Sequence, residues 1–144
     1  MKITRVLAAK GKEIIKILPN QTIREAAARL AEHNIGALVV VEPDNKPVGI
    51  ISERDIVRHL VDKADLLSQP VSSIMTKDLI TGLPDDDLKI VAGTMTEKRI
   101  RHLPILENEQ LVGIVSIGDL VKAQRDQYEG EVDTLQNQLL SNEA

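Results

Sequence analysis

The chain has 144 residues, of which 42% are hydrophobic, and can therefore bury one domain-sized core. It lacks cysteine, which excludes disulfides and thiol nucleophiles, and a net charge of −4 with Tyr128 as the only aromatic residue disfavours nucleic-acid binding. No apolar run approaches the ~20 residues of a membrane span, and the N-terminus lacks a signal-peptide apolar region, so we expect a cytoplasmic protein without a membrane partner.

The first half of the chain predicts a helix, a strand, a second helix, a hairpin and a third helix. An apolar face on the first ten residues predicts a short helix that ends at Gly11. A strand at residues 13–18 precedes an amphipathic helix, which Thr22 or Asn20 should cap. The hairpin strands are expected at 37–41 and 48–51.

Two stretches of the chain share one pattern, in which a β-branched strand and a glycine lead to Ser-x-x-Asp and an amphipathic helix. The motifs pair Ser52 with Asp55 and Ser116 with Asp119. A single motif of this kind is typical of a capping box, in which the serine accepts a backbone N–H and the acid answers. A helix N-terminus also suits a phosphate, and a carboxylate one turn later suits a ribose diol. The duplication favours the ligand interpretation and leaves the capping interpretation open.

The second half of the chain repeats the first. Aligning Leu18-Pro19 with Leu83-Pro84 also aligns the two Ser-x-x-Asp motifs, once one residue is dropped at the hairpin turn. The apolar helix faces match too, with Leu88, Val91, Ala92 and Met95 in the places of Ile23, Ala26, Ala27 and Leu30. Units of roughly 60 residues bury little surface alone, so the two should pack face to face.

These paired units resemble a tandem pair of cystathionine-beta-synthase-type (CBS) domains, or Bateman module, over nearly the whole chain. The resemblance is carried by NIGALVVVE, VGIISERDIVR, IMTKDLIT, EKRIRHLPIL and VGIVSIGDLVKA, which look like stand-alone CBS-pair proteins. It implies an α+β fold of two pseudo-symmetric β-α-β-β-α repeats packed sheet to sheet. It also implies a regulatory module that binds adenine nucleotides (AMP, ATP or NAD(H)) in two clefts. The alternative is a ligand-free structural or adaptor protein that acts through dimerisation and protein partners.

The repeat and the resemblance together predict the domain boundaries. We expect repeat 1 with the N-terminal helix at 1–61, a linker at 62–77, repeat 2 at 78–125 and a helical tail at 126–144. Apolar residues of the tail return at heptad-like spacing that Gly130 interrupts, so the tail either packs on its own domain or forms a dimer contact. Apolar helix faces in both repeats add to the expectation of a homodimer.

The resemblance also implies roles for individual residues. Asp55 and Asp119 match the ribose-binding acids, and Ser52 and Ser116 match the hydroxyls near the phosphates. In such modules each adenine pocket borrows apolar residues from the opposite repeat. The cleft of Asp119 should therefore include Ile15 and Ile35. The cleft of Asp55 should include Ile80 and Ile100, with Thr76 reaching its ligand.

Basic residues predict that the two clefts are unequal. Arg101-His102 stands where relatives often carry basic phosphate contacts, and Arg54 precedes Asp55, whereas a glycine precedes the second acid. The alternative is that both arginines are solvated surface charges and that His102 is a half-buried hairpin residue. We expect the Ser52/Asp55 cleft to bind phosphorylated ligands more tightly.

Catalytic chemistry has little support in the sequence. The three histidines are dispersed, and no nucleophile with an adjacent base or pair of catalytic carboxylates can be assembled. The acidic run at 85–87 is typical of helix capping rather than of a metal site. We therefore expect no enzyme, no catalytic cofactor and no metal, with an adenine nucleotide and a regulated protein as the partners.

Overall fold

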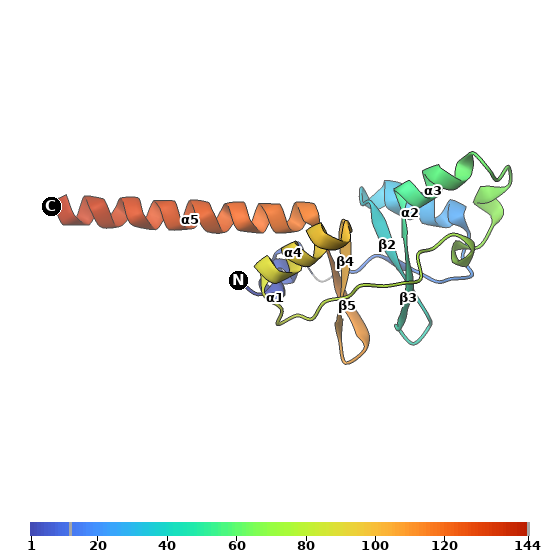
Figure 1. The fold of residues 1–144 in the computed structure, drawn as a ribbon, viewed down its shortest axis with the longest axis horizontal. Helices are drawn as coiled ribbons and strands as arrows, with labels where there is room; N and C mark the ends of the chain where they lie inside the picture. Colours follow the sequence, from blue (N-terminus) through green and yellow to red (C-terminus); the bar gives the residue numbers. More distant parts are fainter. Residues whose placement is uncertain (12, 144) are drawn as a thin grey trace.

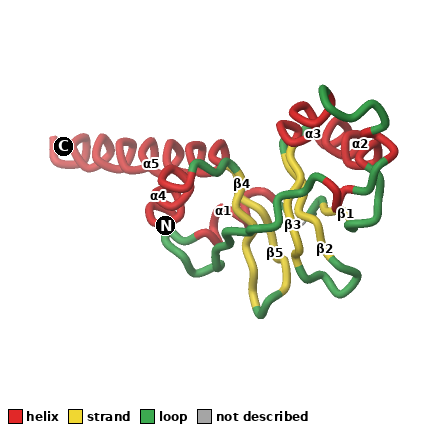
Figure 2. The backbone as a smooth tube through the Cα atoms, turned by 45° about the vertical axis from the view of Figure 1, so that its right-hand side comes forward, coloured by secondary structure: helices red, strands yellow, loops and turns green. Residues whose placement is uncertain are grey.

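A computed structural model describes residues 1–11 and 13–143 and has the α+β architecture expected from the sequence (Figure 1). Two units lie side by side with their sheets between them and their helices outside, and one long helix projects from the second unit (Figure 2). Val39 and Val41 of the first sheet share a buried cluster with Leu111 of the second. The predicted sheet-to-sheet packing of two repeats is therefore confirmed.

The first unit is a three-stranded sheet with two helices. Strand β1 (Lys16–Ile17) pairs in parallel with β2 (Ala37–Val41), which pairs antiparallel with β3 (Pro47–Ser52). Helices α2 (Ile23–His33) and α3 (Glu53–Leu60) complete it. Strand β1 is shorter than the predicted 13–18, because only Lys16 and Ile17 have partners on β2. Thr22, rather than Asn20, caps α2 by accepting a hydrogen bond from the backbone N of Glu25.

The second unit repeats this order with a reduced first strand. It contains α4 (Leu88–Lys98), β4 (His102–Glu107), β5 (Gln110–Ser116) and α5 (Ile117–Glu143). Its first strand shrinks to one parallel bridge, in which Gly82 bonds to the backbone of Pro104 and Leu106 at 2.9 Å each. A Cβ at Gly82 would lie 3.0 Å from Leu103 Cδ2, so the tight approach accounts for glycine here. Asp87 caps α4, as the acidic run predicted.

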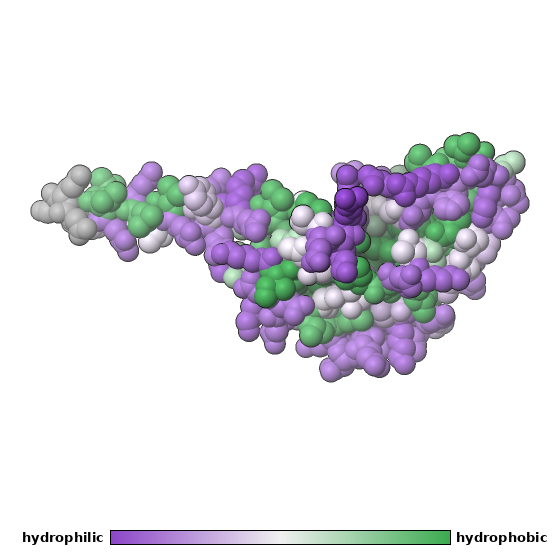
Figure 3. Space-filling view, viewed as in Figure 1, coloured by the Kyte–Doolittle hydropathy of each residue, from purple (hydrophilic) through white to green (hydrophobic). Residues whose placement is uncertain are grey.

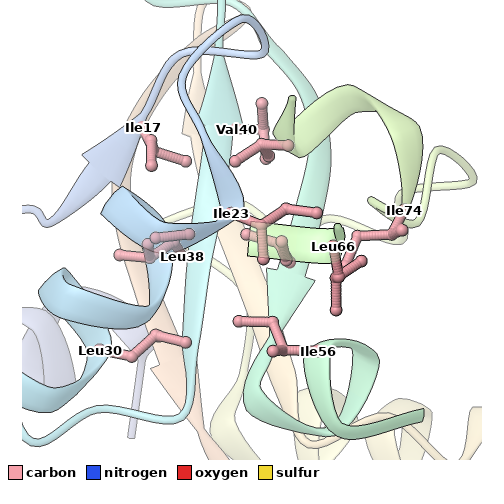
Figure 4. Packing of buried hydrophobic residues seen from close by; sticks show 11 residues of the cluster. Ile17, Ile23, Leu30, Leu38, Val40, Ile56, Leu66 and Ile74 are labelled. Atoms are coloured by element: carbon pink, nitrogen blue, oxygen red, sulfur yellow. The ribbon is translucent and has the colours of Figure 1, made fainter. Parts of the chain in front are cut away.

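Two segments from outside the hairpins close the two cores, and we call residues 1–10 and 69–78 the closing segments. In the first core, the linker's 3₁₀ turns η1 (Leu66–Ser68) and η2 (Val71–Ser73) contribute buried Leu66 and Val71, and Ile74 follows them (Figure 4). In the second core, α1 (Ile3–Lys10) contributes Ile3 and Val6. Each sheet and its helices therefore depend on one closing segment for a complete core.

The expectation that the N-terminal helix belongs with the first repeat is wrong, because α1 packs in the core of the second. The backbone shows why. Leu88 N donates to Met1 O and Ile3 N to Asp86 O, in the way that Ile23 N donates to Gln69 O and Val71 N to Gln21 O. The two closing segments therefore occupy equivalent places, one on each repeat.

Helix α5 continues the second repeat without a break into the predicted tail, of which residue 144 lies outside the described residues. Apolar side chains along it are exposed (Figure 3); they are Val121, Tyr128, Leu135, Leu139 and Leu140. Its outer half extends away from the domain (Figure 1). Over residues 1–11 and 13–143, no helix combines the length and apolar character needed to cross a bilayer.

The closing role of α1 predicts a large loss of stability for Ile3→Ala. Ile3 is fully buried, so truncation should lower the free energy of unfolding in urea by about 2–5 kcal/mol. Val57→Ala, at a residue that is 63% exposed, is the matched control and should change it by less than about 0.5 kcal/mol. Equal, small losses in both variants would contradict the assignment of α1 to the second core.

Candidate functional site

A cavity of about 340 Å³ lies between the two repeats. Its walls bring together Ser116 and Asp119 of the second repeat and Ile15 and Ile35 of the first. These four residues were predicted to share one cleft, and the structure places them in one. We call this cavity the Asp119 cleft.

Both Ser-x-x-Asp motifs form complete capping boxes. Asp119 N donates to Ser116 Oγ at 3.1 Å, and Ser116 N donates to Asp119 Oδ2 at 2.8 Å. Ser52 and Asp55 form the same pair of bonds at 3.1 and 2.9 Å. The capping interpretation is therefore confirmed for both motifs. Within its capping box the Asp119 side chain is still 24% exposed on the cleft wall, and its carboxylate has lone pairs that can accept further hydrogen bonds.

Lys10, at the end of α1, is a residue of the Asp119 cleft that the sequence analysis missed. Its Nζ donates to Asp119 Oδ2 at 2.6 Å and to the carbonyl of Ile114 at 2.8 Å. Burial raises the pKa of Asp119, but the hydrogen bonds from Lys10 and Ser116 outweigh burial and hold the pKa below its ordinary value. Asp119 is therefore an anion near neutral pH and is available to accept hydrogen bonds from a ligand.

The sequence did contain a signal that the segment ending at Lys10 belongs beside the second repeat. Apolar residues in 3–7 and in 71–75 have the same spacing, and in the structure both segments pack on a core and hydrogen-bond to the turn before its helix. In the first repeat, Thr76 exchanges two backbone hydrogen bonds with Ile50 of β3. In the second, the ammonium of Lys10 bonds to Ile114 at the corresponding place on β5. Aligning the two segments would have placed residues 3–10 beside the second repeat, although the alignment gives Lys10 no lysine counterpart.

His102 lies in the Asp119 cleft, so its assignment to the Asp55 cleft is wrong. In the β4–β5 ladder His102 pairs with Ser116, which brings its ring to the same edge as the second Ser-x-x-Asp motif. A Cβ on Gly36 would lie 3.3 Å from both Cε1 and Nε2 of the ring, so glycine leaves room for the imidazole. The ring thus fills space between the two repeats.

Burial lowers the pKa of His102 below its ordinary value of 6.5, and the positive charge of Lys10 lowers it further. Asp119 and Glu53 oppose this shift, while Arg101 adds slightly to it. His102 is therefore a neutral imidazole near pH 7, with one donor and one acceptor nitrogen.

The other predicted site residues lie elsewhere. Arg54 and Arg101 are exposed and do not line the Asp119 cleft, in agreement with the alternative of solvated charges. Ile80 and Ile100 pack against the core of the second repeat. Ser52, Asp55 and Thr76 surround β3 and the start of α3, outside the Asp119 cleft. In the parts of the chain that the structure describes, no cluster of three or more His, Asp or Glu residues could hold a metal ion.

A second hollow adjoins the cleft. A groove of about 860 Å³ runs between α1 and α5, and Val6, Ala9 and Ala123 form part of its apolar wall. Lys10 and Asp119 line both the groove and the cleft. Their ion pair therefore lies at the boundary between the cleft and the groove.

Comparison with known proteins agrees with this architecture. A family model described as CBS domain matches residues 10–62 and 71–126. The CBS domain-containing protein YhcV of Bacillus subtilis is 38% identical over 108 residues, which are 75% of this chain and 76% of that protein. The crystal structure of the CBS-domain containing protein ATU1752 from Agrobacterium tumefaciens matches with a TM-score of 0.81 and 38% identity, covering 86% of this chain and 99% of the other.

A third relative was solved with ligands. The CBS domain pair of protein MJ0100, in complex with 5′-methylthioadenosine and S-adenosyl-L-methionine, matches with a TM-score of 0.78 and 30% identity. The match covers 88% of this chain and 98% of that one. Both of its ligands contain adenosine.

The lowered pKa of His102 predicts that acid destabilises the fold through this residue. Between the folded pKa of His102 and 6.5, the unfolded chain binds a proton at this residue more readily than the folded chain does. The stability that neutral His102 contributes is therefore present above pH 6.5 and is lost as the pH falls through the folded pKa. Urea unfolding at pH 7.5, 6.5 and 5.5 should show a smaller loss in His102→Gln than in the wild type. His33→Gln, at an exposed histidine, should behave as the wild type. Identical pH dependence in all three proteins would refute the contribution.

Proposed function

The chain belongs to the CBS domain family, and from that premise we propose that it is a non-enzymatic regulatory protein that binds an adenine nucleotide in the Asp119 cleft. One observation carries the proposal: an apolar wall from the first repeat faces an ionised aspartate and a helix N-terminus of the second. The adenosine ligands of the MJ0100 domain pair support this ligand class. AMP, ATP and NAD(H) all contain the required adenosine group.

The chemistry of the cleft suits the parts of a nucleotide. Ile15 and Ile35 offer apolar surface for the faces of an adenine ring, whose burial is favourable at roughly 25 cal/mol per Å². Asp119 can accept hydrogen bonds from both ribose hydroxyls. Ser116 has an O–H that can donate to a phosphate beside the first turn of α5. Each part of the ligand thus meets a group of matching polarity.

The duplication extends the proposal to a second cleft. Ser52 and Asp55 repeat the bonded geometry of Ser116 and Asp119 at the start of α3. We assign a second ribose-binding role to Asp55 on this basis, with Thr76, Ile80 and Ile100 as its expected neighbours.

Asp119→Ala tests the proposed ribose contact. In calorimetric titrations of the full chain with AMP, carried out in an Asp55→Ala background that leaves only this cleft, the variant should lose at least tenfold in affinity, because two charge-assisted hydrogen bonds are removed. Asp87→Ala is the matched control: it removes an N-cap, on α4, at a cost of about 0.5–2 kcal/mol of stability, and should bind AMP normally. If Asp119→Ala binds AMP as tightly as the control, the ribose assignment fails and the adaptor alternative gains support.

We also propose that two copies of the chain associate through helix surfaces, including that of α5. Val121, Tyr128 and Leu135 recur at heptad spacing, and each is more than half exposed. Leu139 extends the same stripe. A second α5 would remove these side chains from water, and such apolar seams drive helix pairing.

The combined variant Leu135→Lys and Leu139→Lys should shift the protein to monomer in sedimentation equilibrium at micromolar concentration. Buried lysine ammonium groups would oppose the pairing. Asn137→Lys adds a lysine on the opposite side of the same helix turn and should leave the dimer intact. A monomeric wild-type protein, with or without AMP, would contradict this arrangement.

A further inference from the structure

The Asp119 cleft contains one fixed positive charge beside the proposed ribose contact. Of its two basic residues, His102 is neutral near pH 7, which leaves the ammonium of Lys10. Two acids, Asp119 and Glu13, line the same cavity. Lys10 is therefore the cation that an anionic group of a ligand could meet in this cavity.

The end of α1 fixes the position of this charge. Lys10 is the last residue of the helix, and Gly11 ends it with a φ of +92°, a conformation that glycine adopts without strain. Hydrogen bonds to Asp119 Oδ2 and Ile114 O then hold Nζ against β5 and the start of α5. The ammonium is thus anchored at the cleft wall, at one edge of the aspartate.

Hydrogen-bonding capacity remains at this point. A lysine ammonium has three N–H donors, and two of them go to Asp119 and Ile114. The side chain is 36% exposed, so its third donor is accessible. The Ser116 hydroxyl accepts from Asp119 N and keeps its own hydrogen for a further acceptor. Two donors thus flank the carboxylate that would hold a ribose.

We infer that Lys10 makes the Asp119 cleft selective for adenosine ligands that carry an anionic 5′ group, a phosphate above all, over ligands with an uncharged 5′ group. This inference rests on the proposed function. A ribose held by Asp119 places its 5′ substituent one sugar ring from the carboxylate that Lys10 contacts. The third N–H can then bind a phosphate oxygen without loss of the ion pair.

The first repeat has no lysine at this place. In the alignment of the closing segments, which matches Ile3 with Val71, the counterpart of Lys10 is Asp78, an exposed acid. Without a lysine at this position the first repeat lacks the charged donor that would bind a phosphate, so the anion preference should belong to the Asp119 cleft alone. This reverses the order expected from the positions of Arg54 and Arg101.

The test compares two ligands that differ at the 5′ position. AMP and 5′-methylthioadenosine are titrated calorimetrically into the full chain in an Asp55→Ala background, which isolates the Asp119 cleft. AMP should bind at least tenfold more tightly than the thioether. Lys10→Met should weaken AMP binding about 10- to 100-fold and leave 5′-methylthioadenosine within about twofold, because a bond from a charged donor is lost only with the phosphate. Lys16→Met removes an equal charge from a lysine bonded to Asn45, outside the cleft, and should change neither affinity.

The outcomes separate the inference from the proposed function. Equal affinities for the two ligands, or an equal loss of both in Lys10→Met, would overturn the selectivity and leave adenosine binding intact. A response of Lys16→Met equal to that of Lys10→Met would show a general charge effect and would also overturn it. Failure of both ligands to bind at all would overturn the proposed function and this inference with it.

Discussion

Neither repeat buries its own core, and the two closing segments supply what is missing. Ile3 and Val71 are both fully buried at equivalent places, and each segment hydrogen-bonds to the turn before the helix that it covers. A unit of roughly 60 residues gains too little from burial alone to offset its conformational entropy. The second repeat therefore depends for its core on a helix that precedes the first repeat in the chain.

The closing segments also make a duplicated scaffold chemically unequal. Residues 69–76 form a 3₁₀ turn and an extended stretch, which bonds to β3 through the backbone of Thr76. Residues 3–10 form an α-helix, and a lysine side chain makes the corresponding contact on β5. The second repeat thus has a lysine bonded to its aspartate, whereas the first makes the corresponding strand contact through a peptide group. Because Lys10 and Asp119 also border the groove beside α5, a ligand on this ion pair would adjoin the projecting helix.

Periodicity and capping chemistry predicted the helices and hairpins closely, because both are local properties of the sequence. Contacts between segments that are distant in the chain were harder to predict. The pattern of Ile3 and Val6 identifies a buried face but does not indicate which core that face packs against. In the structure it packs in the core of the second repeat. The first strand of the second repeat is only a single bridge at Gly82. Its length depends on backbone pairing with β4, which the local sequence does not specify.

The candidate site shows the same division. The resemblance correctly grouped Ile15, Ile35, Ser116 and Asp119, because the pseudo-symmetry of the fold relates these positions. His102 went to the wrong cleft, since its place depends on the register that pairs it with Ser116. Lys10 was missed because it belongs to neither repeat motif and reaches Asp119 from a distant part of the chain.

The central claim is that an adenine nucleotide occupies the Asp119 cleft. A crystal structure of the full chain grown with AMP tests it most directly. We expect a nucleotide with its adenine between Ile15 and Ile35, its ribose hydroxyls on Asp119 and its phosphate within hydrogen-bonding distance of Lys10 Nζ. Crystals in which AMP is bound only outside this cavity, or in which the Lys10–Asp119 pair is retained with no nucleotide bound at saturating AMP, would contradict it.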